Sequence, residues 1–160
     1  AVYIASTFSH VIQQPQWKRA FRILDQALIY LLIAGSYTPW ALVYFRTGLG
    51  WLLFGAMWTI ALGGFISKVC FSHRIDGVSI WIYVLLGWLP VLGIGDIFRL
   101  IPLAAVIWML VGGLCYTSGT LFLVLDKKDY HFHAIWHLFV IAGSTCHYLA
   151  VLYYVVPSAA

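Results

Sequence analysis

Residues 102–125 have the sequence PLAAVIWMLVGGLCYTSGTLFLVL, and this run decides the class of fold. It contains no Asp, Glu, Lys, Arg or His, and it exceeds the about 20 residues that a helix needs to cross the hydrocarbon core of a bilayer. In lipid, only helices and closed barrels satisfy every backbone hydrogen bond. Barrel strands are shorter and alternate in polarity, so the run predicts a transmembrane helix.

The composition of the whole chain agrees with this interpretation. Of its 160 residues, 63% are hydrophobic and only 9% are charged, whereas a soluble domain is about 45–50% apolar and about 25% charged. A water-soluble globule is therefore excluded. The net charge of +4 does not indicate a nucleic-acid partner, because in a membrane protein the position of each charge matters more than the sum. We expect an all-α, polytopic transmembrane helical bundle that forms a single domain over residues 1–160.

Polar or basic clusters separate further apolar runs of membrane-spanning length. They predict five complete spans and one partial span. The complete spans cover roughly residues 23–43, 51–69, 78–94, 102–125 and 134–156, and the partial span covers residues 1–12. Residues 1–12 are apolar from the first position but too few to cross about 30 Å at about 1.5 Å per residue. We therefore expect the sequence to be truncated at its beginning.

The basic residues predict the sidedness of the bundle. Seven of the nine Lys and Arg residues fall in three alternate loops, at residues 13–22, 67–77 and 126–131, and the other two are Arg46 and Arg99. Short cytoplasmic loops carry an excess of Lys and Arg. The pattern therefore places these three loops in the cytoplasm and the C-terminus outside.

A few polar residues lie in the predicted spans, where each is a candidate functional residue by default. Ser6 and His10 are four residues apart in the partial span, Asp25 opens the next span, and His133 and His137 open the last one. A spacing of four places side chains on one helix face. The predicted sidedness puts four of these residues at one depth near the cytoplasmic surface: His10, Asp25, His133 and His137. Three imidazoles with an open fourth position are typical of catalytic zinc, so we predict His10, His133 and His137 as zinc ligands.

Structural roles remain open for the same residues. The three histidines could be buried neutral imidazoles that hydrogen bond to backbone or hydroxyl groups. Asp25 could be a carboxylate that stabilises the start of a helix and pairs with Arg19 or Arg22, and Ser6 could be a packing serine.

The remaining histidines and the cysteines are expected to have other roles. His147 lies about 21 Å deeper than His133 along a helix, so it cannot share the same ion. We expect it to make an interhelical hydrogen bond or to line an interior cavity. His73 and His131 are expected to meet water. Cys70, Cys115 and Cys146 are expected to be apolar packing residues without a disulfide framework.

Several strings of this sequence resemble the hemolysin III family. These are ASTFSH at residues 5–10, LDQA at 24–27, LLIAGSYTP at 31–39, HAIWHLFV at 133–140 and STCH at 144–147. That family belongs to the progestin and adipoQ receptor group, which includes the adiponectin receptors and is related to alkaline ceramidases. The resemblance runs from residue 1 to about residue 156, in the order and spacing of the family.

The resemblance implies a seven-helix bundle with a cytoplasmic N-terminus and an external C-terminus, of which this chain lacks the first helix and part of the second. Ser6 and His10 match the family's Ser-x-x-x-His motif, and His133 and His137 match its His-x-x-x-His motif. The implied zinc ligands are His10, His133 and His137. Asp25 is implied to contact a zinc-bound water or to act as a general base. In a hydrolase, we expect Ser6 to stabilise the developing oxyanion or to orient the site.

The expected function is that of a zinc-dependent hydrolase that cleaves a ceramide-like lipid amide taken from the membrane. The alternative is a non-catalytic membrane receptor or signalling scaffold with a structural zinc site. A pore-forming haemolysin, which the family name suggests, is disfavoured because no predicted span carries a continuous polar stripe. The resemblance favours a bacterial plasma membrane as the location.

Overall fold

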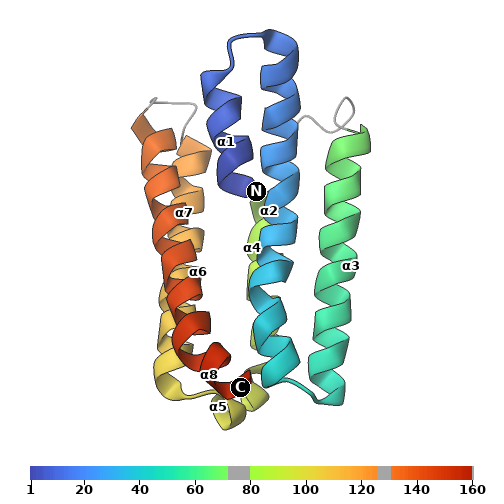
Figure 1. The fold of residues 1–160 in the computed structure, drawn as a ribbon, viewed down its shortest axis with the longest axis vertical. Helices are drawn as coiled ribbons and strands as arrows, with labels where there is room; N and C mark the ends of the chain where they lie inside the picture. The colour runs from blue at the N-terminus through green and yellow to red at the C-terminus, as the bar shows by residue number, and fades with distance from the viewer. Residues whose placement is uncertain (72–79, 126–130, 160) are drawn as a thin grey trace. The chain divides into compact units, whose positions relative to one another are not determined.

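The computed structural model describes residues 1–71, 80–125 and 131–159, and within these ranges the chain forms helices and no strand. The expected all-α fold is confirmed. The elements in chain order (Figure 1) are α1 (Val2–Val11), α2 (Pro15–Val43), α3 (Gly48–Phe71), α4 (Ile80–Trp88), the 3-10 helix η1 (Leu89–Gly93), α5 (Ile94–Leu100), α6 (Leu103–Leu125), α7 (His131–Ala150), the π-helix η2 (Val151–Val155) and α8 (Val156–Ala159).

Five helical segments of the described chain are long and apolar enough to cross a membrane. They are Pro15–Val43, Gly48–Phe71, Ile80–Leu100, Leu103–Leu125 and His131–Ser158. The ten-residue helix α1 corresponds to the predicted partial span. The protein is therefore a polytopic membrane protein, as its composition indicated.

Helices α2 and α3 extend beyond the predicted spans. Helix α2 begins at Pro15 rather than at residue 23, so most of the loop expected at residues 13–22 is helical. Proline suits the first turn of a helix, where its missing N–H is not needed, and Lys and Arg are good helix formers. Hydropathy marks only the part of a helix that lies in lipid, and this explains the difference.

The third predicted span is interrupted. It consists of α4, η1 and α5, with Pro90 inside η1, and it runs to Leu100 rather than to residue 94. Proline removes one backbone donor and cannot continue an α-helix without a distortion. By contrast, α2 remains continuous past Pro39.

The chain divides into two compact units. Unit 1 comprises Ala1–Thr38 and Leu52–Leu89, and unit 2 comprises Pro39–Trp51 and Pro90–Ala160.

In unit 1, helices pack around Tyr30 of α2. Its ring centroid lies 4.6 Å from that of Tyr83 on α4, and a Cβ on Gly64 of α3 would lie 2.5 Å from the Tyr30 ring. Gly64 therefore provides the space in which α3 approaches α2. Helix α1 packs on α2 through Phe8 and Phe21, whose ring centroids are 5.1 Å apart.

In unit 2, α6 and α7 lie side by side (Figure 1). A Cβ on Gly112 would lie 3.2 Å from the carbonyl oxygen of Gly143, and a Cβ on Gly143 would lie 3.1 Å from that of Gly112. Small residues at a contact between membrane helices allow their backbones to approach closely. The two glycines thus set the spacing of this pair.

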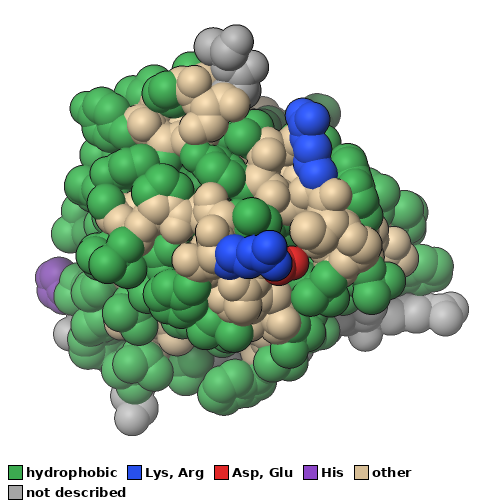
Figure 2. Space-filling model, turned by 90° about the horizontal axis from the view of Figure 1, so that it is seen from below, with side chains coloured by type: hydrophobic (Ala, Val, Ile, Leu, Met, Phe, Trp, Pro, Cys, Tyr) green, Lys and Arg blue, Asp and Glu red, His purple; other side chains and the backbone are tan. Residues whose placement is uncertain are grey.

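The segment that follows α2 is tied to other parts of unit 2 by hydroxyl groups. The Tyr44 hydroxyl donates to the carbonyl of Tyr154 at 2.6 Å and lies 2.8 Å from the Ser158 hydroxyl. The Thr47 hydroxyl donates to the Asp96 carboxylate at 3.2 Å. Figure 2, seen from the end where α5 and α8 lie, shows a mostly hydrophobic and uncharged face with few Lys, Arg or acidic side chains.

Candidate metal centre

The start of α7 places two histidines on one helix face. The helix begins at His131, so His133 and His137 occupy its first two turns. Their ring centroids are 4.7 Å apart, with the rings nearly perpendicular at 84°, and both side chains are half-buried. Two histidines one turn apart can bind the same ion.

The third histidine comes from α1. His10 lies in the last turn of α1 and is exposed, and Ser6 lies one turn earlier and is buried. Ser9 is also buried, and its hydroxyl donates to the Ser6 carbonyl at 2.7 Å. Sequence reasoning did not single out Ser9. The signal that could have found it is the small-residue face of α1, which consists of Ala5, Ser6 and Ser9.

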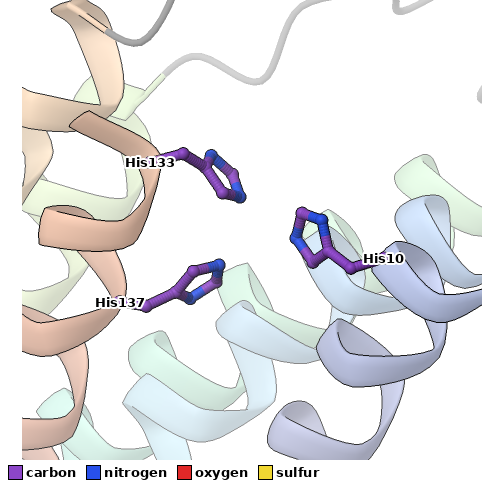
Figure 3. A group of neighbouring side chains, drawn as sticks. All are labelled: His10, His133 and His137. Atoms are coloured by element: carbon purple, nitrogen blue, oxygen red, sulfur yellow. The ribbon is translucent and has the colours of Figure 1, made fainter. Parts of the chain in front are cut away.

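His10, His133 and His137 form a group that can hold a metal ion (Figure 3). Each offers one ring nitrogen, and these atoms all lie within 4.8 Å of one another. Two nitrogens bound to one tetrahedral zinc at about 2.0–2.1 Å lie about 3.3 Å apart. Three neutral imidazoles are a donor set that zinc prefers.

Asp25 contributes no atom to this group of ligand atoms among the residues that the structure describes. Asp25 is half-buried on α2. The next residue, Gln26, accepts a 2.7 Å hydrogen bond at its carbonyl from the Tyr83 hydroxyl. Packing between α2 and α4 thus fixes the turn that carries Asp25.

His147 lies in a different environment on α7. Its ring stacks on that of Tyr116, with centroids 5.6 Å apart and planes inclined by 15°, and a Cβ on Gly112 would lie 2.7 Å from its Cδ2 atom. Next to it, the Tyr116 and Ser144 hydroxyls form a 2.7 Å hydrogen bond between α6 and α7. His147 is therefore a packing residue of the α6–α7 contact.

The other histidines and cysteines that the structure describes are not part of the group. His131 is exposed at the start of α7, and His73 lies outside the described residues. Cys70 is an exposed free thiol, and Cys115 and Cys146 are half-buried free thiols.

Comparison with known proteins identifies the family of the chain. The sequence profile described as "Haemolysin-III related" matches residues 1–148. Hemolysin-3 of Bacillus cereus is 40% identical over 158 residues, which cover 99% of this chain and 72% of that protein. The Hemolysin-3 homolog of Bacillus subtilis (strain 168) is 36% identical over 155 residues, which cover 97% of this chain and 72% of that protein.

A more distant relative comes from an animal. The monocyte to macrophage differentiation factor of Homo sapiens is 30% identical over 166 residues, with 99% of this chain and 67% of that protein covered. No solved structure matches the chain. The resemblance that the histidine motifs indicated is confirmed, and the chain belongs to the haemolysin III-related family of membrane proteins.

Proposed function

We propose that this protein is a zinc-dependent hydrolase that cleaves an amide bond of a membrane lipid, with His10, His133 and His137 as the zinc ligands. The observation that carries the proposal is the grouping of three imidazole nitrogens within 4.8 Å of one another. A site of three histidines leaves a fourth position open, which is typical of catalytic rather than structural zinc.

A bound zinc ion supplies the central chemistry, because it lowers the pKa of water to about 7 and polarises a carbonyl group. The chain's own residues have supporting roles. Asp25 orients the attacking water and accepts its proton. The chain contains no Glu, so a carboxylate base in this protein has to be an Asp. The Ser6 hydroxyl donates a hydrogen bond to the carbonyl oxygen of the substrate, where negative charge develops.

The membrane location of the chain supports a lipid as the substrate. Large apolar side chains are exposed on the spanning helices, including Leu52 at 68% and Leu121 at 65% exposure. Such surfaces suit contact with acyl chains. A ceramide-like amide, which carries its scissile bond near the polar end of a lipid, is the substrate that we propose.

We further propose that the protein lies in a bacterial plasma membrane, with the metal site near the cytoplasmic face and the C-terminus outside. The positive-inside rule supports this orientation. In intact cells, a membrane-impermeant thiol reagent is expected to label Ser158→Cys and to spare Arg19→Cys in a background without native cysteines. Labelling of the second variant alone would reverse the orientation.

The principal experiment measures zinc content and hydrolysis of a ceramide-like amide by purified protein in lipid nanodiscs. The native protein is expected to bind one zinc per chain and to release fatty acid. Asp25→Asn keeps the size of the side chain and removes its charge, so it should retain zinc and lose about 100-fold or more of the rate of hydrolysis. Unchanged hydrolysis by a zinc-loaded Asp25→Asn protein would exclude Asp25 as the base.

The same experiment separates the hydrolase from a receptor or scaffold with a structural zinc. Zinc bound at full stoichiometry with no turnover would favour the structural role. The names of the Bacillus relatives also suggest a lytic activity, and release of a dye from vesicles by the purified protein tests it. We expect no release, because no described spanning helix presents a continuous polar face.

A further inference from the structure

The first two turns of α2 form a basic surface that the proposed chemistry does not use. This surface, which we call the α2 basic surface, consists of Lys18, Arg19 and Arg22. The two arginines are exposed and Lys18 is half-buried, and the first turn of α2 carries no acidic residue. The structure makes this segment helical from Pro15, so the three cations have fixed positions rather than lying in a loop.

These cations lie at the level of the lipid headgroups. Helix α2 continues from the α2 basic surface directly into its membrane-spanning part, and Trp17 beside the cations is 59% exposed. Trp is enriched at the boundary between membrane and water. Clusters of Lys and Arg next to a spanning segment attract anionic headgroups, with about a fivefold gain in affinity per cation.

The α2 basic surface shares a helix face with the candidate general base. At about 100° per residue, Lys18, Arg22 and Asp25 lie within an arc of about 60°. Along the helix axis, Asp25 is about 4.5 Å from Arg22 and about 10 Å from Lys18. A headgroup bound by these cations would therefore be close to Asp25, at a distance no greater than the length of the headgroup itself.

In unit 1, the same end of the structure also carries His10. The contact between Phe8 and Phe21 sets the register of α1 against α2, and the chain reverses direction between Val11 and Pro15. With these helices antiparallel, His10 is level with residue 19 of α2. The cations thus flank the end of α1 that carries a proposed metal ligand.

We infer that the α2 basic surface binds the headgroup of an anionic lipid, and that the ceramide-like amide proposed as the substrate for this reason carries an anionic headgroup. The second part of the inference rests on the proposed function, and the first part does not. The occupant is a lipid of the surrounding membrane, because the surface adjoins the spanning part of α2 and an exposed Trp.

The test uses metal-free protein, so it does not depend on catalysis. Binding of a fluorescent phosphatidylglycerol and of a fluorescent phosphatidylcholine is measured in detergent micelles. Native protein is expected to bind the anionic probe more tightly. The triple variant Lys18→Gln/Arg19→Gln/Arg22→Gln should lose about 100-fold in affinity for that probe and should bind the neutral probe unchanged.

Matched variants keep the test specific. Arg46→Gln/Arg99→Gln removes two exposed arginines of unit 2 and should leave binding unchanged, whereas Arg22→Lys keeps the charge and should retain binding. An unchanged melting temperature shows that the triple variant is folded. Native-like binding by the triple variant, an equal loss in the Arg46/Arg99 variant, or displacement of the probe by millimolar inorganic phosphate but not by matched chloride would overturn the inference.

A second arm compares hydrolysis of anionic and neutral lipid amides by zinc-loaded protein. The native protein should prefer the anionic amide, and the triple variant should lose this preference. Equal rates on both amides in the native protein would overturn the assignment of the substrate class. Hydrolysis of neither amide would refute the proposed function, and the binding arm would still decide the headgroup surface.

Discussion

Helix α7 carries histidines in two places, and the two environments differ. At its start, the His133 and His137 rings face each other edge-on with centroids 4.7 Å apart, and they join His10 in a group of neighbouring ligand atoms. Farther along, the His147 ring lies flat on Tyr116 and close over Gly112. At the start of α7, ring nitrogens of several histidines lie near one another. At His147, the faces and edges of the ring contact apolar and aromatic atoms.

The comparison indicates that the groups around a histidine in a membrane helix distinguish a candidate metal ligand from a packing residue. A ligand needs other donors at distances of a few ångströms. A packing histidine needs a surface of matching shape, and Gly112 supplies it by having no side chain. Predictions that test this distinction follow from the largest expected effect to the smallest.

The largest effect is expected from removal of a proposed zinc ligand. His137→Ala should lower zinc affinity by at least about 100-fold, because even residues that only support a ligand contribute 10–100-fold. Competition with a zinc-sensitive dye measures the affinity. His147→Ala, a change of the same kind on the same helix, should leave the affinity within about threefold of native, and an equal loss in both variants would contradict the distinction.

The next largest effect is expected at the close contact between Gly112 and the His147 ring. Gly112→Ala should destabilise the α6–α7 pair by about 1–3 kcal/mol, because a Cβ there would lie 2.7 Å from His147 and overpacking has costs of this size. Thermal unfolding in detergent measures the change. Gly63→Ala is the control, since a Cβ on Gly63 would meet no atom within 4 Å, and it should not destabilise the protein.

Removal of the imidazole should relieve that clash. In the double variant Gly112→Ala/His147→Ala, the new methyl group meets space that the ring has left, so the loss of stability should be smaller than the sum of the two single losses. Simple additivity, as expected for sites without contact, would show that the imidazole is not what Gly112 accommodates. Zinc affinity should remain native throughout this series.

The smallest effect is expected from Tyr116→Phe. This change removes the hydroxyl that lies 2.7 Å from the Ser144 hydroxyl and keeps the ring that stacks on His147. Hydrogen bonds between membrane helices contribute about 0.6 kcal/mol on average, so the free energy of unfolding should fall by roughly that amount. A loss of more than about 2 kcal/mol would assign this hydroxyl a larger role in the α6–α7 contact.

Most of the fold could be predicted from the sequence, because helix residues that contact lipid have to be apolar and therefore form long hydrophobic runs. The run at residues 102–125 became α6 with nearly the same bounds. The start of α2 could not be predicted in this way, because Lys18, Arg19 and Arg22 lie outside the apolar run although they are in the same helix. The break at Pro90 was also hard to place, since Pro39 lies in a continuous helix.

The candidate site was predicted in part. The spacing of four residues predicted that His133 and His137 share a face, since helix geometry alone decides this, whereas the approach of His10 depended on predicted sidedness and on the family resemblance. The packing environment of His147 could not be predicted, because it depends on which residues of α6 face position 147. Ser9 was missed because its burial is signalled only by the small-residue face that it forms with Ala5 and Ser6.

The central claim is that His10, His133 and His137 together hold one zinc ion. X-ray absorption spectroscopy at the zinc edge of purified, zinc-loaded protein tests it most directly. We predict a shell of nitrogen and oxygen atoms at about 2.0–2.1 Å that includes three imidazoles, with one imidazole fewer in His10→Ala. A shell with sulfur atoms at about 2.3 Å, or an imidazole count that is unchanged in His10→Ala, would contradict the claim.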